Sequence, residues 1–240
     1  MALTNEISVT YKGGPGYSRT ASTLASGKRT LKGGLSMLVG GKVYPVGALT
    51  ALALSLPGAD ADGGILVWSP QQRVRIALTG GTSQTLGLTS ITFGASTVDI
   101  SIKLGTDNAD AVTTTGAALA AFIRTHGLLS QILRVAPRGT GASICAVATV
   151  TAVPQVMLLG WAAKTYDNSA GGSDLAVEME FKTGVAQAAP ASGDAPTRAM
   201  VGGQVTLTDD VTCAAAYDPF ALQAELVDVT ASGYPYIRVG

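Results

Sequence analysis

The chain has 240 residues, enough for one large domain or two small ones, and only 13% of them are charged, against roughly 25% in an ordinary soluble domain. A chain with so little charge either covers its surface with partners or lies in a membrane. The membrane alternative fails at 139–163, an uncharged run long enough to span a bilayer, because it contains Pro154 and Gln155 and its part 144–153 is typical of a strand. The start of the chain has no secretory pattern, so we expect assembly and use in a cytoplasm.

The first 42 residues concentrate the basic charge: they hold six of the sixteen lysines and arginines, and Glu6 is their only acidic residue. The glycine- and proline-rich run 13–16 excludes a continuous helix. We therefore predict that residues 1–34 form an extended N-terminal arm that becomes ordered by lying along another surface. A protein surface is favoured over nucleic acid, because two tyrosines offer little stacking area. The candidate partner-binding residues are Tyr11, Lys12, Tyr17, Arg19, Lys28, Arg29 and Lys32.

Short strands are predicted from residue 35 on. Residues 37–43 place two apolar stretches around a Gly-Gly pair, which is typical of a hairpin. A further apolar stretch at 49–56, a polar turn at 57–64 and a strand at 65–68 complete this section. We assign 35–72, together with 154–240, to one β-domain.

A different pattern occupies 73–153, where strands surround a helix. Strict alternation over 98–104 predicts a half-buried strand, the clearest in the chain. Residues 113–115 are threonines that can cap a helix running to about Thr125, and Gly127 is placed to end it. Residues 128–135 suit either a second short helix or a strand, and 144–153 returns as a strand. We therefore predict that 73–153 is a small α+β domain inserted into the β-domain.

After Pro154 the strand pattern resumes at 156–161 and, with strict alternation, at 175–181. Further strands are predicted near 199–207, 211–215, 222–229 and 236–239. Residues 200–205 echo the pattern of 37–43. The echo is explained either by chance or by a structural repeat, and a repeat would place both segments in one domain. The predicted fold is thus mainly β: a β-barrel or sandwich-like domain with an inserted α+β domain and an extended arm.

Motifs that would carry catalysis are missing from the sequence. His126, the only histidine, follows the predicted helix, where it can interact with the last helical carbonyls. Cys145 and Cys213 lack metal-ligand spacing, which favours reduced core thiols over a disulfide formed after release from the cell. Paired aspartates lie in predicted polar turns, where aspartate bonds to its own backbone. Trp68 and Trp161 lie in apolar strands and are predicted to be core residues rather than sugar platforms. We predict no enzyme activity, no cofactor and no metal.

The run 98–141 resembles a module of virion structural proteins of tailed bacteriophages. It carries a strand, the turn Gly-Thr-Asp-Asn-Ala-Asp, Ala-Val-Thr-Thr-Thr before an alanine-rich helix, and then Arg-Gly-Thr-Gly. The flanks are similar to capsid decoration (cement) proteins, small β-barrel proteins rich in alanine, glycine, valine and threonine, with Gly-Gly hairpins such as 39–43 and 201–205. The presence of 73–153 departs from the smallest members of that class.

This resemblance implies a non-enzymatic role on the exterior of a virion capsid. The implied partners are the major capsid protein and further copies of the chain, as a homotrimer, and the implied effect is capsid stabilisation. Two alternatives stay open: a phage tail or head-fibre structural protein, and a carbohydrate-binding or adhesin module that uses 73–153 to bind a host-surface glycan.

Overall fold

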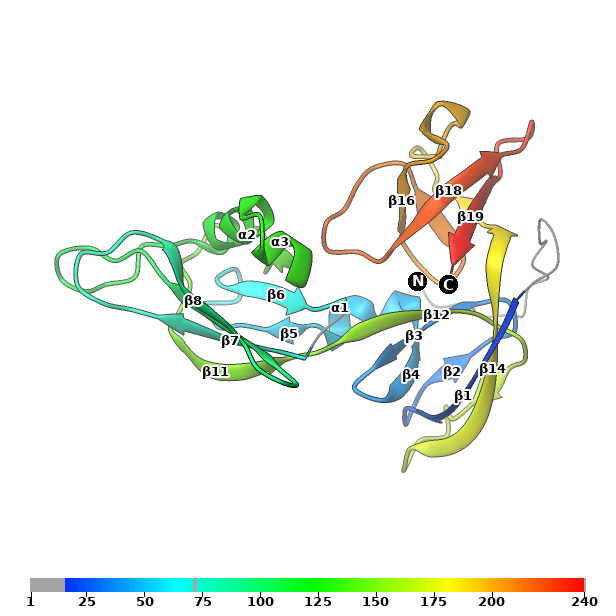
Figure 1. The fold of residues 1–240 in the computed structure, drawn as a ribbon, viewed down its shortest axis with the longest axis horizontal. Helices are drawn as coiled ribbons and strands as arrows, with labels where there is room; N and C mark the ends of the chain where they lie inside the picture. The colour runs from blue at the N-terminus through cyan, green and yellow to red at the C-terminus, as the bar shows by residue number, and fades with distance from the viewer. Residues whose placement is uncertain (1–15, 71–72, 240) are drawn as a thin grey trace. The chain divides into compact units, whose positions relative to one another are not determined.

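The computed structural model describes residues 16–70 and 73–239 (Figure 1). Its fold is mainly β, as the sequence predicted, and the barrel or sandwich-like domain of that prediction contains a closed five-stranded barrel. The chain forms two compact units. The first comprises the described residues up to Ala51 and those from Met157 on, and the second is Leu52–Val156. The second unit is therefore inserted in the sequence of the first.

The barrel of the first unit closes through one long strand, β14 (Leu175–Gln187). The barrel runs in the order β1 (Gly16–Leu24), β4 (Lys42–Pro45), β3 (Leu35–Val39), β12 (Val156–Ala162) and β14. Nine antiparallel residue pairs between β1 and β14, from Gly16↔Thr183 to Leu24↔Leu175, join the first strand to the last. Residues 16–24 of the predicted arm thus pair within their own chain.

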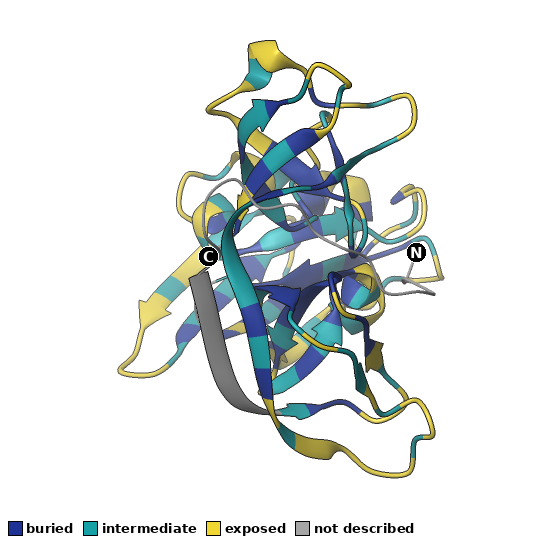
Figure 2. Cartoon of the chain, turned by 90° about the vertical axis from the view of Figure 1, so that its right-hand side faces the viewer, coloured by how far each residue is buried: buried dark blue, intermediate teal, exposed yellow. Residues whose placement is uncertain are grey.

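Alternation along β14 supplies much of the barrel interior. Met179 and Phe181 are fully buried, whereas Glu178 and Lys182 on either side of them and Glu180 between them are not. Figure 2 shows the burial of each residue along the strands. The two buried side chains pack with Leu24, Val43 and Ala162 of the other strands. Full burial of such side chains contributes roughly 1.5–3 kcal/mol each, so this small cluster helps to hold the barrel closed.

The hairpin predicted at 37–43 is confirmed. β3 pairs with β4 in register from Ser36↔Pro45 to Val39↔Lys42, and Gly40 and Gly41 both have positive φ, 57° and 82°. Two consecutive residues of positive φ make the turn whose twist suits a tight hairpin. The echo at 200–205 has a different structure: a 3-10 helix, η2 (Arg198–Met200), precedes β16 (Gln204–Leu207). A structural repeat is therefore wrong for this pair of segments.

A second sheet of the first unit begins at the end of β14. The last four residues of β14 pair with β19, so β14 takes part in both sheets (Figure 1). The sheet continues through β19 (Pro235–Val239), β18 (Gln223–Val229), β16, β17 (Thr212–Ala214) and β15 (Ala189–Pro190). A separate two-stranded ladder joins β2 (Arg29–Thr30) to β13 (Tyr166–Asp167). A 3-10 turn, η1 (Val46–Ala48), leads into α1 (Leu49–Leu52) at the boundary between the units.

The second unit combines two sheets with two helices around one core. A four-stranded sheet has the order β11 (Ala148–Val153), β7 (Val74–Thr79), β9 (Val98–Lys103) and β8 (Gly87–Phe93). A three-stranded sheet has the order β10 (Arg134–Pro137), β6 (Ile65–Trp68) and β5 (Leu54–Ser55). The helices are α2 (Gly116–Thr125) and α3 (Leu129–Ile132).

The unit starts at Leu52, whereas the sequence analysis placed the start of the insertion at residue 73. The reason is strand pairing: β6 pairs with β10 through Val67↔Val135, and both valines are buried in the core of this unit.

Thr115 caps α2 by accepting a hydrogen bond from Ala118 N at 3.2 Å, as one of the three predicted capping threonines. Residues 128–135 contain both α3 and the start of β10.

Gly160 is a position in the barrel where only glycine fits. Its φ is +117°, and a Cβ at this residue would lie 2.5 Å from the carbonyl oxygen of Lys182 in β14. β12 pairs with β14 directly beside this point, through Trp161↔Lys182. A side chain at residue 160 would therefore push apart the two strands that complete the barrel.

We predict that Gly160→Ala lowers the free energy of unfolding by about 3 kcal/mol, since backbone strain and a steric clash act together. Gly40→Ala is the matched control: its φ is also positive, but no atom lies within 4 Å of the added Cβ. It should cost only about 1 kcal/mol. Denaturant unfolding of the two variants measures both values, and equal costs would contradict the proposed clash.

Candidate functional site

The structure places the predicted partner-binding residues in three groups. Tyr11 and Lys12 lie outside the described residues. Tyr17 and Arg19 lie on β1, within the barrel ladder. Lys28, Arg29 and Lys32 lie around β2, on the segment that follows β1.

Residues 28–32, called the basic segment below, contact the loop 164–174 of the same unit, which carries Asp167 and Asp174. Arg29 Nε lies 3.2 Å from Asp167 Oδ2, and these two residues also pair across the β2–β13 ladder. Asn168 fastens the loop further, because its Nδ2 donates to the carbonyls of Leu24 and Ser173 at 3.2 and 3.0 Å. This pairing holds the basic segment against its own chain.

A second ion pair joins Lys42 Nζ to Asp174 Oδ2 at 2.6 Å. The Asp174 carboxylate also accepts a hydrogen bond from Ser26 N at 3.0 Å. The hydrogen bond from Lys42 and the one from Ser26 N lower the pKa of Asp174, and the hydrogen bond and charge of Asp174 raise the pKa of Lys42. The side chains of Lys42 and Asp174 are 45% and 32% exposed, so solvent screens the pair and it ties the loop down without adding much stability.

Two of the predicted contact residues keep their charge unpaired among the described residues. Lys32 is exposed and Lys28 is half-buried, and neither forms an ion pair with a described residue. The sequence shows that this segment has an excess of basic charge. It does not show that the charge of Arg29 is neutralised, because Asp167, its partner, lies far from it in the chain. The basic charge that this segment can offer a partner is therefore smaller than the sequence suggests.

Residues with catalytic potential have local structural contacts. His126 Nδ1 accepts from Leu129 N at 3.5 Å, and its ring centroid lies 5.7 Å from that of Phe122. This contact links α2 to α3, whereas the sequence suggested contact with helical carbonyls. Asp60 accepts from Ser143 Oγ at 2.8 Å, and this hydrogen bond is the largest cause that lowers its pKa. Across 16–70 and 73–239, no group of three potential metal ligands occurs.

Both cysteines and both tryptophans are core residues. Cys145 lies in the core of the second unit and Cys213 is fully buried in the first, and both thiols are free. Burial raises the pKa of Cys145, and it raises the pKa of Cys213 to about 12. Trp68 and Trp161 are at most 2% exposed, which confirms them as core residues.

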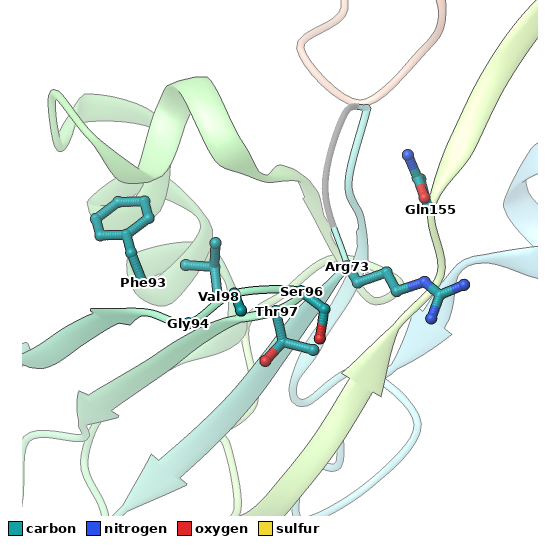
Figure 3. Close-up of a pocket in the computed structure, with 8 residues that line it drawn as sticks. Arg73, Phe93, Gly94, Ser96, Thr97, Val98 and Gln155 are labelled. Atoms are coloured by element: carbon teal, nitrogen blue, oxygen red, sulfur yellow. The ribbon is translucent and has the colours of Figure 1, made fainter.

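A pocket of about 420 Å³ opens in the second unit beside the end of β8 (Figure 3). Phe93 lies at one end of its lining and Arg73 and Gln155 lie at the other, and the side chains of Ser96 and Thr97 point away from the Phe93 ring. Arg73 is exposed and forms no ion pair with any described residue. The pocket offers polar groups and one aromatic ring, but no nucleophile paired with a base.

An uncharged edge of the second unit is the feature that the sequence analysis did not single out. Residues 80–97 contain no charged side chain, and most of them are exposed. They include β8, an outer strand of its sheet, and Phe93, which is 61% exposed. The signal was readable in the sequence as an eighteen-residue run without charge, but only the sheet order shows that this run forms an edge.

Comparison with protein-family models, with curated proteins and with solved structures found no match to this chain. Among the described residues, no helix combines the length and the apolar character needed to cross a bilayer.

We predict that Asp174→Asn destabilises the protein most between about pH 4 and pH 10. The lowered pKa of Asp174 provides stability above the pKa of the unfolded carboxyl, and this is lost as pH falls through the folded value. The raised pKa of Lys42 provides stability below the pKa of the unfolded lysine, and this is lost as pH rises through the folded value. Unfolding free energies of variant and wild type should therefore converge at both extremes.

Glu178→Gln is the control for this titration, since Glu178 is an exposed carboxylate of the same unit that forms no ion pair with any described residue. A difference between wild type and Asp174→Asn that stays constant from pH 2 to pH 7 would contradict the assigned role of the pair.

We also predict that neither thiol reacts with a disulfide reagent at pH 8 in the folded protein, because burial hinders both access and ionisation. Two thiols per chain should react once denaturant unfolds it. Absorbance of the released thiolate counts them, and one fast-reacting thiol in the native state would overturn the assignment of both cysteines to the core.

Proposed function

We propose that this protein is a non-enzymatic virion structural protein that binds the outer surface of a phage capsid and stabilises the shell, as decoration proteins do. Its partners would be the major capsid protein and further copies of itself, assembled as a homotrimer in the host cytoplasm. The observation that carries the proposal is the combination of a closed barrel with long exposed segments that lack charge.

Large apolar side chains on these segments support a role in contacts. Val147, which precedes the edge strand β11, is 56% exposed, and Val150, within β11, is 61% exposed. Phe93, on the opposite edge of the same sheet, is 61% exposed. Exposed apolar residues grouped on strand edges are typical of surfaces that pair with other chains. The low overall charge fits the same interpretation, since a protein covered by neighbours needs less charge for solubility.

Anchoring by the basic segment remains part of the proposal. Lys28 and Lys32 are the described residues of this segment that could meet an acidic capsid surface, while Arg29 is engaged by Asp167. Several weak contacts of this kind would add up through avidity when neighbouring copies bind one lattice. The sheet of the second unit would then contact a neighbour or project from the shell.

The pocket beside β8 favours a second candidate, a glycan-binding module. Arg73, Gln155, Ser96 and Thr97 offer hydrogen-bond partners for hydroxyls, and Phe93 offers an aromatic face. A glycan array probed with the full chain tests this function. A glycan that binds the wild type but not Phe93→Ser would support it, and the absence of any such glycan would leave the role in the shell.

The decisive experiment compares shells that carry the protein with shells from which it has been stripped. We predict that stripped shells release DNA at a lower temperature, and that adding back the purified protein restores the original value, because a bound protein stabilises the state to which it binds. Dye-detected DNA release during heating measures both. Unchanged release temperatures would sink the proposal.

Labelling of a tagged copy by electron microscopy separates the head from the tail. Label distributed over the shell supports decoration, whereas label along the tail or on fibres assigns the protein to the alternative structural class.

The double variant Lys28→Glu/Lys32→Glu tests the role of the basic segment when it is added back to stripped shells. Arg29→Gln is its control, since Arg29 already pairs within the chain. The charge reversal should weaken shell binding more than the control.

A further inference from the structure

We propose that the edge strand β8 is a self-pairing surface, through which the second units of two copies join antiparallel about a two-fold axis. The contact would extend two four-stranded sheets into one continuous sheet of eight strands. Such a two-fold contact would join copies of neighbouring trimers rather than copies within one trimer. It needs no capsid, so the inference can fail or hold independently of the proposed function.

The outer edge of β8 has unused backbone hydrogen-bonding groups. β8 is the last strand of its sheet, antiparallel to β9 from Gly87↔Lys103 to Phe93↔Val98. On its other side, no described residue forms a backbone hydrogen bond to Gly87–Phe93. Backbone groups along such an edge are a template for another strand.

The charge of the edge argues for a second copy as the occupant. Natural edge strands are commonly protected by lysine, proline or an inward-pointing charge, and β8 has none of these. The surrounding run 80–97 is uncharged as well. Two identical edges can approach each other only if they do not repel, and this edge meets that condition. A strongly charged partner would gain no ion pair here.

The apolar residues of β8 select the register. Ile91 and Phe93 point to the same face, because they pair with Ile100 and Val98, which are both buried. In an antiparallel pair, opposing residues share a face. Centring the two-fold axis on Thr92 therefore places Ile91 opposite Phe93 of the second copy, twice, and Thr92 opposite Thr92.

This register explains the exposure of Phe93. An aromatic residue that is 61% exposed on an edge strand loses contact with water when a β-branched side chain lies across from it. Figure 3 shows the Phe93 ring directed away from Ser96 and Thr97, at the rim of the pocket. The pairing would cover this rim.

The contact is expected to be weak and reversible. The ladder between β8 and β9 is irregular between Leu88 and Ser90, so only the four residues Ser90–Phe93 form a regular edge. A contact of this length lies far below the area of a stable protein interface. It becomes effective where copies are concentrated, as in an assembly.

Charge exchange at Thr92 tests the proposal on the full chain. Thr92→Lys and Thr92→Glu each place like charges opposite each other, and each should raise the dissociation constant about fivefold. An equimolar mixture of the two variants should recover the wild-type value or bind more tightly. Sedimentation equilibrium over a range of concentrations, at about 50 mM salt to limit screening, measures all four samples.

Phe93→Ser is the second variant, and it should weaken association at least tenfold, because the register loses two Ile91–Phe93 contacts. Its side chain is largely exposed, so the thermal unfolding midpoint should stay near that of the wild type. Equal masses for wild type and both Thr92 variants at every concentration would overturn the proposal. Weakening by both variants without recovery in the mixture would overturn it too, since that result shows that the residues at position 92 of the two copies do not lie opposite each other.

Discussion

The first unit depends on β14, because this strand joins parts of the chain that are far apart in sequence. Its residues up to Thr183 pair with β1, and its last four pair with β19. β12, which follows the inserted unit, pairs with it as well. The barrel therefore cannot close until the segments 16–24 and 156–162 have both reached β14. Such non-local pairing is slow to form, so we expect the inserted unit, with its more local contacts, to fold before the barrel.

Buried polar contacts fix how the second sheet meets the barrel within the first unit. Asp210, in the turn between β16 and β17, is 3% exposed. Its carboxylate accepts from Gly47 N at 2.7 Å, and its carbonyl accepts from Leu35 N at 2.6 Å at the start of β3. A buried carboxylate is costly unless it is hydrogen-bonded. The turn that carries Asp210 must therefore lie where the backbone of Gly47 can donate to this carboxylate, a requirement that an exposed polar turn does not have. Asp210 belongs to one of the aspartate pairs that the sequence predicted only as parts of polar turns.

Local patterns predicted the elements whose signals lie within a few residues. The Gly-Gly hairpin, the alternating strands β9 and β14 and the threonine-capped helix α2 all follow from their own sequence. The strand β1 was missed because its sequence, rich in serine and threonine, shows no apolar alternation; it is a strand because β14 and β4 flank it. The pairing of Val67 with Val135 and that of Arg29 with Asp167 were equally invisible, since single-sequence patterns do not encode long-range partners.

The candidate surface shows the same division between local and long-range information. Absence of charge over 80–97 is a local property, but its meaning depends on the sheet order that makes β8 an edge. Both edges of this sheet are uncharged, and both are irregular, between Leu88 and Ser90 in β8 and between Ala148 and Thr151 in β11. Bulges are one of the devices that limit edge-to-edge aggregation. Here they replace charge in that role: they shorten the regular edge so that pairing stays reversible, while the neutral side chains still allow it. A lysine at the centre of the same edge would instead weaken the pairing, because it would face the same lysine of the second copy.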